Sequence, residues 1–242
     1  MTEKKHGKKI KAASGRYIFF ILSVLLLING CASYTVKKTD GEIIFYKDGI
    51  KTARWYETDS GVLVKEGGPV NGRFTEYREN GKKKAEYEYQ NGLLEGAVKK
   101  YDEEGRLVSR IEYKENARNG KAEYFYKSGA LKESGVFSKG RKDGTWESYY
   151  ESGMPEKEYE YRNGKRDGFW FCSYETGEIK EEGMYQKGVQ EGTFKCRYRS
   201  GEWRERGDYK NGKKHGLWEE YNKDGSVKAK KVYKDGAVVK EQ

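Results

Sequence analysis

Few side chains in this sequence have the types and spacing that catalysis requires. His6 falls in a basic N-terminal segment that we expect to be removed, which leaves His215 as the histidine available for a catalytic triad or a zinc site. No catalytic or metal-ligating partner for His215 lies outside its own Lys-Lys-His-Gly loop. The abundant carboxylates recur without an evident cleft to raise a pKa, and no Gly-Lys-Ser/Thr phosphate loop opens a helix. We therefore predict a protein that is not an enzyme and has no cofactor or metal.

Two cysteines, Cys172 and Cys196, are 24 residues apart. In the repeat described below they hold the same position in adjacent units, and this invites a disulfide in an oxidising compartment. With two strands per unit, however, equivalent positions are about 9–10 Å apart, whereas a disulfide needs Cα atoms within about 7 Å. We expect both thiols to be free. No histidine or further cysteine accompanies them to bind a metal.

The N-terminus has the pattern of a secretory signal. A basic segment precedes an uncharged, largely apolar run from Tyr17 to Ile28, which is shorter than the ~20 residues of a transmembrane helix. The basic residues are Lys4, Lys5, Lys8, Lys9, Lys11 and Arg16. The predicted signal peptide is residues 1–30. An uncleaved anchor and an ordinary signal peptide remain alternatives.

A cysteine follows directly after the small residue Gly30, as in the lipobox of bacterial lipoproteins. That resemblance implies cleavage after Gly30, diacylation of Cys31 and attachment of the protein to a membrane. Ala32 follows instead of aspartate, which resembles lipoproteins sent to the outer membrane of diderm bacteria. In other bacteria the same anchor would hold the protein on the outer face of the cytoplasmic membrane.

The net charge argues against nucleic acid as a partner. Without the five lysines, the arginine and the glutamate of residues 1–30, the 49 basic and 39 acidic residues of the chain become 43 and 38. The net charge falls from +10 to +5, and the two signs are interleaved along the sequence. Nucleic-acid binding needs a clustered basic patch, which an interleaved pattern does not supply.

Glycines recur with a fixed period of 24 residues over most of the chain. The lead glycines of seven units are Gly72, Gly96, Gly120, Gly144, Gly168, Gly192 and Gly216. A second glycine follows each of them nine residues later, and a third lies 20 residues later in every unit except the second, where Asn116 replaces it. Two columns that stay in phase over seven units predict a repeat protein, in which neighbouring units bury apolar surface against one another.

Each unit has the pattern of a β-hairpin. In the fourth unit, residues 145–150 and 156–161 are rich in strand-forming residues, the turn at 151–153 separates them, and Asn163-Gly164 reverses the chain again. A helix is disfavoured because each interior glycine costs about 1 kcal/mol against alanine. We therefore predict an all-β protein, an elongated single-layer antiparallel sheet of about seven hairpins.

Aromatic residues repeat with the same period and are the candidate binding residues. The last aromatic of one unit should contact the aromatic that follows the next lead glycine. The expected pairs are Phe137 with Trp146, Tyr161 with Trp170, and Tyr209 with Trp218. The candidate binding residues are Trp146, Tyr161, Trp170, Tyr209 and Trp218. The alternative is that cross-strand packing already uses these rings.

The segments Tyr161-Arg-Asn-Gly-Lys-Arg-Asp-Gly-Phe-Trp170 and Tyr209-Lys-Asn-Gly-Lys-Lys-His-Gly-Leu-Trp218 resemble the bacterial variant of the MORN repeat. The resemblance covers about residues 67–242. It is strongest in the fourth to seventh units and weakens over residues 96–125, where Val98 and Ala122 replace the tryptophan. It implies an array of hairpins that serves protein or membrane association, with no catalytic residues. Many bacterial members carry an antitoxin label.

These observations predict three regions. Residues 1–30 are the signal peptide. Residues 31–66 are a lipid tether, expected over residues 32–38, followed by a degenerate cap with short strands at 43–46, 53–56 and 62–64. Residues 67–242 are the repeat array, which ends in a partial unit.

The predicted function is a membrane-tethered scaffold that binds a protein partner at the bacterial cell envelope or surface. One alternative is an antitoxin-like or immunity-like protein that masks a toxin. Another is binding of envelope glycans or lipid headgroups through the rows of aromatic residues. The sequence does not identify the protein partner or the oligomeric state.

Overall fold

The computed structural model describes residues 34–39, 41–58 and 63–241, and none of these residues is helical. The chain divides into residues 1–31 and residues 32–242, and every described residue belongs to the second unit. The first four strands are β1 Tyr34–Thr39, β2 Glu42–Lys47, β3 Ile50–Glu57 and β4 Leu63–Gly67. The strands of the repeats are β5 Gly72–Tyr77, β6 Lys83–Gln90, β7 Leu93–Leu94, β8 Gly96–Tyr101, β9 Leu107–Lys114, β10 Ala117–Phe125, β11 Leu131–Ser138, β12 Arg141–Tyr149, β13 Pro155–Arg162, β14 Lys165–Ser173, β15 Ile179–Gln186, β16 Val189–Gln190, β17 Gly192–Arg197, β18 Trp203–Lys210, β19 Lys213–Tyr221, β20 Val227–Lys234 and β21 Ala237–Glu241.

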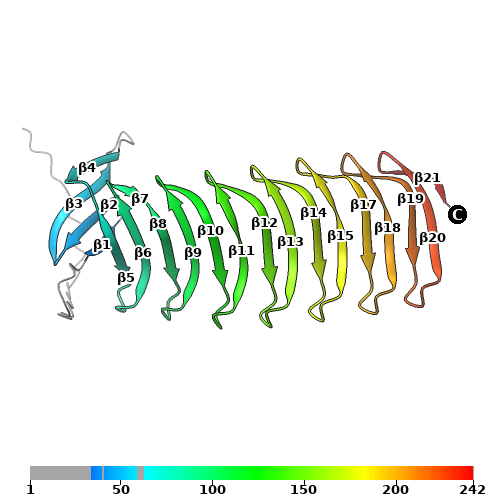
Figure 1. Ribbon diagram of the computed structural model, residues 1–242, viewed down its shortest axis with the longest axis horizontal. Coiled ribbons are helices and arrows are strands. Elements are labelled where there is room, and N and C mark those ends of the chain that lie inside the picture. Colours follow the sequence, from blue (N-terminus) through cyan, green and yellow to red (C-terminus); the bar gives the residue numbers. More distant parts are fainter. Residues whose placement is uncertain (1–33, 40, 59–62, 242) are drawn as a thin grey trace, which may run out of the picture. The chain divides into compact units, whose positions relative to one another are not determined.

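All 21 strands belong to one open sheet. From β5 to β21 the six- to nine-residue strands and the last strand pair antiparallel with their neighbours, so that the hairpins follow one another in chain order (Figure 1). The two-residue strands β7 and β16 extend the pairing of β6 and β15 beside β8 and β17. One parallel pairing, between β1 and β5, joins the first four strands to the array and makes the sheet mixed. The predicted all-β hairpin repeat is confirmed.

Strands β1–β4 add a second layer at the start of the array. The Phe45 ring in β2 lies 5.3 Å from Phe74 and 5.5 Å from Tyr89, although β1 and β5 separate β2 from β6 in the sheet. The sheet must therefore fold over for these rings to meet, and β1–β4 lie at an angle to β5 and β6 (Figure 1). The core they enclose consists of Val36, Phe45, Ala53, Val70, Phe74 and Tyr89. The expected single layer thus describes only the later hairpins.

The segment 32–38, which we expected to be a lipid tether, contributes its described residues to strand β1. Its pairing with β2 runs over the whole strand, from Tyr34 opposite Lys47 to Thr39 opposite Glu42. Because Val36 is 6% exposed and packs in the core with Phe45, this strand is anchored by burial. A tether can therefore extend only through residues that precede Tyr34.

Two kinds of turn alternate along the array. Asn163 and Gly164 have φ values of 51° and 81°, as a two-residue turn of type I′ requires at both central positions. At the other end of the hairpin, Tyr150 N–H donates to Met154 O and Gly153 N–H to Tyr150 O, both at 2.8 Å. Glycine or asparagine in these columns is thus explained by positive φ, and Asn116 keeps the turn with a φ of 69°.

The strands after the type I′ turns are longer than predicted. Strand β12 begins at Arg141, before the lead glycine, because the two-residue turn passes the chain directly into the next strand. Gly144 then lies inside β12 with a φ of 71°, where the register between β11 and β12 shifts. Such a shift is a β-bulge, and glycine accommodates its left-handed backbone without steric cost.

The register assigns alternate side chains to two faces of the sheet. We call one the tryptophan face; its central row holds Phe74, Tyr87, Val98, Ile111, Ala122, Gly135, Trp146, Tyr159, Trp170, Gly183, Phe194, Gly207 and Trp218. We call the other the charge face; its central row holds Glu86, Lys99, Arg110, Glu123, Ser134, Glu147, Glu158, Phe171, Glu182, Lys195, Arg206, Glu219 and Lys230.

Candidate functional site

The aromatic residues predicted to bind a partner are packed into the tryptophan face. Trp146, Trp170 and Trp218 are 2%, 6% and 2% exposed, and Tyr161 and Tyr209 are half-buried. Two of the three expected ring pairs are confirmed. Phe137 lies 5.0 Å from Trp146 and Tyr209 lies 5.1 Å from Trp218 between ring centroids.

The third expected pair is replaced by another. Trp170 stacks on Tyr159, with ring centroids 5.6 Å apart and planes inclined by 9°. Tyr161, the expected partner, lies beside Trp146 at 6.5 Å. Tyr159 is directly opposite Trp170 in the register. Tyr161 is opposite Arg166, just as Phe137 is opposite Lys142 and Tyr209 is opposite Lys214, so the register alone does not separate the three pairs.

Glycines opposite the tryptophans explain this difference. The indoles of Trp146 and Trp218 lie over Gly135 and Gly207, where a Cβ atom would come within 2.3 Å of the ring. In that position each indole Nε1 donates to a backbone carbonyl at 3.0 Å, that of Val136 or Asp208. Tyr159 fills the equivalent place opposite Trp170, and the buried Nε1 of Trp170 has no partner among the described residues.

Basic side chains cover the exposed side of these rings. The Nζ atom of Lys142 lies 3.6 Å from the ring centroid of Trp146, and that of Lys214 lies 3.8 Å from Trp218. The Arg166 guanidinium lies 3.9 Å from the Tyr159 ring. Each cation is attracted to the negative face of its ring. The central row of the tryptophan face therefore stabilises the fold and presents little open aromatic surface to a ligand.

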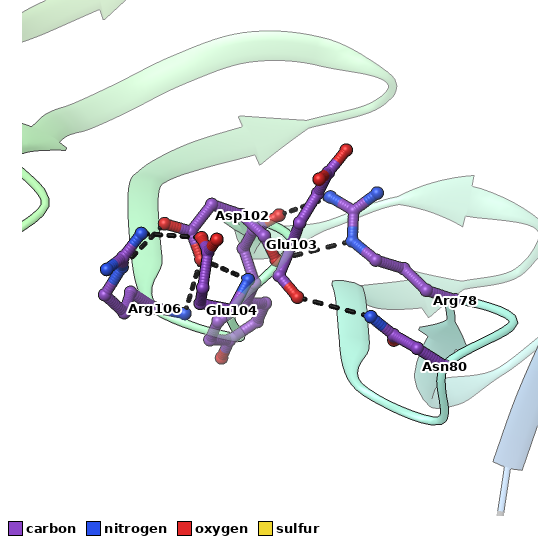
Figure 2. Close-up of polar contacts among 7 residues, drawn as sticks. Arg78, Asn80, Asp102, Glu103, Glu104 and Arg106 are labelled. Carbon is purple, nitrogen blue, oxygen red and sulfur yellow. Dashed lines mark hydrogen bonds and ion pairs between the residues drawn. The ribbon is translucent and has the colours of Figure 1, made fainter.

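A tyrosine that precedes a three-residue turn, such as the turn at 151–153, forms a hydrogen bond to the next unit, and we call this contact a latch. In four successive units a tyrosine hydroxyl donates to the carbonyl at the end of the next unit's first strand. The pairs are Tyr126 with Tyr149 at 2.7 Å, Tyr150 with Ser173 at 2.7 Å, Tyr174 with Arg197 at 2.9 Å, and Tyr198 with Tyr221 at 2.9 Å. In the first unit Arg78 replaces tyrosine and donates to Tyr101 O at 2.8 Å and to Asp102 O at 3.3 Å (Figure 2).

The second unit lacks this latch. Asp102 holds the tyrosine position, and its carboxylate accepts hydrogen bonds from the backbone of Glu104 and from Arg106 within its own turn (Figure 2). Desolvation raises the pKa of the Asp102 carboxyl, but the hydrogen bonds from Arg106 outweigh it and hold that pKa below its usual range. The turn is thus stabilised locally, without a link to the third unit.

Polar residues just before the lead glycines fasten the opposite turns. Asp143 Oδ1 accepts the backbone N–H of Asn163 at 3.0 Å, and the equivalent acceptors in other units are Asn71, Glu95, Asn119, Asp167 and Glu191. His215 occupies this column in the seventh unit, and its buried Nδ1 has no partner among the described residues. The position of His215 is therefore that of a turn residue. A column of Asp, Asn and Glu before the glycines was the sequence signal for this role.

Cys172 and Cys196 lie on the tryptophan face as buried, free thiols. Strand β15 separates them, because Cys172 and Cys196 are each opposite Glu181 in the register. Burial raises the pKa of both thiols. The two residues share a row of the sheet as the repeat spacing predicted.

We expect Cys172 and Cys196 to react slowly with a maleimide in the folded protein, because both are buried and protonated at neutral pH. After unfolding in guanidinium without reductant, both should react at the rate of an exposed thiol. Mass spectrometry of the labelled peptides measures this. A peptide pair linked through Cys172 and Cys196 would contradict the observed register.

Cys31 and Gly30, the predicted lipidation and cleavage residues, lie outside the described residues. Across 34–39, 41–58 and 63–241, no helix has the length and apolar character needed to cross a membrane.

The fold and its repeated contacts define a repeat protein built of β-hairpins. Four of its segments, residues 70–91, 94–115, 142–163 and 214–235, match the family described as MORN repeat variant. Each segment begins two residues before a lead glycine and ends at the first residue of the type I′ turn. No curated protein shows significant similarity to the chain.

The four matches do not follow the tryptophan column. Segment 94–115 is matched although it carries Val98, whereas Trp170 lies outside the four segments. Our expectation that the resemblance is strongest from the fourth to the seventh unit is therefore only partly met. The turns and the lead glycine are common to all seven units, and these features do not depend on the aromatic residue.

Proposed function

We propose that this protein is a membrane-tethered, non-enzymatic scaffold that binds a protein partner at the bacterial cell envelope. The observation that carries this proposal is the continuity of the rows. Because each hairpin pairs in the same register with the next, side chains of one kind recur across a broad surface. The matches to the MORN repeat variant support a role in binding or interaction.

The tether in this proposal depends on the sequence. Residues 1–30 have the features of a lipoprotein signal, and Cys31 follows the small residue Gly30. Diacylation would supply the two lipid chains that stable anchoring requires. We propose an outer-membrane location if the source is a diderm bacterium, and otherwise the outer face of the cytoplasmic membrane.

Replacing Cys31 with alanine should abolish lipid attachment and leave the signal peptide uncleaved. We expect a product that is longer by about 30 residues and that incorporates no radiolabelled palmitate. Gel mobility and intact mass measure the processing, and Cys172→Ala serves as the control that should leave it unchanged. A Cys31→Ala product that is processed and fractionates like the original chain would rule out the lipoprotein proposal.

Photo-crosslinking in cells tests the scaffold itself. A photoreactive phenylalanine analogue placed on the full chain, once on each face of the sheet, should give discrete adducts with a protein. Absence of protein adducts at all positions, together with an unchanged amount of folded protein, would overturn the proposal. An adduct with a toxin encoded nearby would identify the antitoxin-like alternative. The glycan alternative is disfavoured because its aromatic row is buried and covered by cations.

A further inference from the structure

An apolar patch is exposed on the charge face of the sheet. Phe169 in β14 and Met184 in β15 are directly opposite each other in the register and are 37% and 45% exposed. Phe171 lies two residues further along β14 on the same face, with its ring centroid 6.2 Å from that of Phe169. Solvent thus meets three large apolar side chains at one place on a face that is otherwise mostly charged.

The charge row beside this patch is interrupted. Elsewhere in the row a glutamate pairs with a basic residue of the neighbouring hairpin. These pairs are Glu86 with Lys99 at 3.4 Å, Glu123 with Arg110 at 2.8 Å, Glu182 with Lys195 at 3.3 Å, and Glu219 with Arg206 at 2.6 Å. Glu219 also pairs with Lys230 at 2.8 Å.

Glu147 and Glu158 break this pattern. They are opposite each other in the hairpin of β12 and β13, and their outer neighbours in the row are Ser134 and Phe171. Neither carboxylate forms an ion pair with a described residue, although Glu147 accepts a hydrogen bond from the Tyr149 hydroxyl at 2.6 Å. Two like charges that are directly opposite each other destabilise an antiparallel pair of strands. Two units away in either direction the equivalent positions hold cations, Lys99 opposite Arg110 and Lys195 opposite Arg206. The pair Glu147 and Glu158 therefore lacks the basic groups that the row holds at these positions in other units.

The carboxylates around Glu158 repel one another. Desolvation and the neighbouring carboxylates of Glu147 and Glu160 raise the pKa of the Glu158 carboxyl above its usual value. Glu160 forms no ion pair with a described residue either, and it lies on the same face one row away, opposite Thr145. A positively charged group at this place would be attracted to up to three carboxylates, whereas an anionic lipid or a nucleic acid would be repelled.

We propose that Glu147, Glu158, Glu160, Phe169, Phe171 and Met184 form a docking surface for a protein segment that carries a lysine or arginine beside an apolar side chain. The cation sits between the carboxylates of Glu147 and Glu158 and completes the charge row. The apolar side chain covers Phe169 and Met184 and removes the ring of Phe169 and the methyl group of Met184 from water. This inference rests on the proposed function as a protein scaffold and specifies the chemistry of its partner.

A defined peptide tests the docking surface. The probe is a fluorescent seven-residue peptide of alternating lysine and valine, and its binding to the purified full chain in a neutral detergent is followed by fluorescence anisotropy. Binding to empty micelles is subtracted. We expect saturable binding that weakens at least about tenfold, or 1.4 kcal/mol, in the Glu147→Gln/Glu158→Gln double variant. A peptide with serine in place of each lysine should bind the original chain at least as weakly as the lysine peptide binds the double variant.

The seventh unit offers a matched control. Leu217 and Val232 are opposite each other at the positions equivalent to Phe169 and Met184, and Leu217 is 47% exposed. Their neighbours in the charge row, Arg206, Glu219 and Lys230, are paired. Phe169→Ser/Met184→Ser should therefore reduce binding, and Leu217→Ser/Val232→Ser should not. Three results would overturn the docking surface: equal losses of affinity in the two serine double variants, equal binding of the lysine and serine peptides, or no saturable binding of the lysine peptide. If protein adducts form in cells but only at positions remote from Phe169, the scaffold stands and this inference fails.

Discussion

Replacing Gly207 with valine should destabilise the protein by about 2–4 kcal/mol, because overpacking a core costs 1–3 kcal/mol and a hydrogen bond about 1 kcal/mol more. A Cβ atom at this position would lie 2.3 Å from the Trp218 indole, which is 2% exposed. Displacing the ring would also break the hydrogen bond from its Nε1 to Asp208 O. Urea unfolding followed by circular dichroism measures the loss.

A second substitution separates this clash from a general intolerance of the site. In the Gly207→Val/Trp218→Leu variant the indole is absent. Valine at position 207 should then lower the free energy of unfolding much less than it does when Trp218 is present. Without the indole, valine is the better strand residue, since it favours the extended backbone and glycine does not. If Gly207→Val alone is neutral or stabilising, the packing of the indole over Gly207 is not the reason for glycine in this column.

Removing the Trp218 side chain should have the largest effect of a single truncation. Trp218 contacts the rings of Tyr209 at 5.1 Å, Phe194 at 5.8 Å and Tyr233 at 6.2 Å, and Lys214 lies over it. Trp218→Ala therefore leaves a cavity between three strands, and we expect a loss of about 3–5 kcal/mol. The same unfolding experiment measures it.

Trp203 is the control for this truncation. It is half-buried, the Arg197 guanidinium lies 3.5 Å from its ring centroid, and no other aromatic ring among the described residues contacts it. Trp203→Ala should cost about 1–2 kcal/mol, since less apolar area is removed from burial. Equal losses for Trp203→Ala and Trp218→Ala would mean that the tryptophan row does not carry the stability we assign to it.

The hairpin repeat could be predicted because its signals are local. A type I′ turn needs positive φ at two successive residues, so Asn-Gly and Lys-Gly steps in a fixed column identify it without knowledge of the partners of the strand. The layer formed by β1–β4 could not be predicted in this way. It depends on the parallel pairing of Val36 with Glu76 and on burial of Phe45 against Phe74. In each case the two residues are distant in sequence.

The candidate binding residues show the same limit. The aromatic column was visible in the sequence, but the burial of Trp146 depends on a glycine, Gly135, in the opposite strand and on a lysine two residues before the lead glycine. The exposed patch around Phe169 was missed for a related reason. Its carboxylates, Glu147 and Glu158, are distinctive only when the row across the strands is known, because glutamate is common in every unit.

We infer that the array is modular and that latches between neighbouring units set the stability of each part. The second unit should be the weakest place. Val98 and Ala122 supply small side chains to the central row, Asn116 holds a left-handed turn position at a cost of order 1 kcal/mol, and Asp102 forms no latch to the third unit.

Hydrogen exchange of the full chain, read by mass spectrometry along the sequence, tests this claim most directly. We predict that backbone amides in residues 96–125 exchange first and that those in residues 140–225 exchange last. Replacing Asp102 with tyrosine should restore the latch and slow exchange in residues 96–125 while leaving residues 192–225 unchanged. Uniform protection across all seven units, insensitive to Asp102→Tyr, would show one cooperative structure and contradict the modular account.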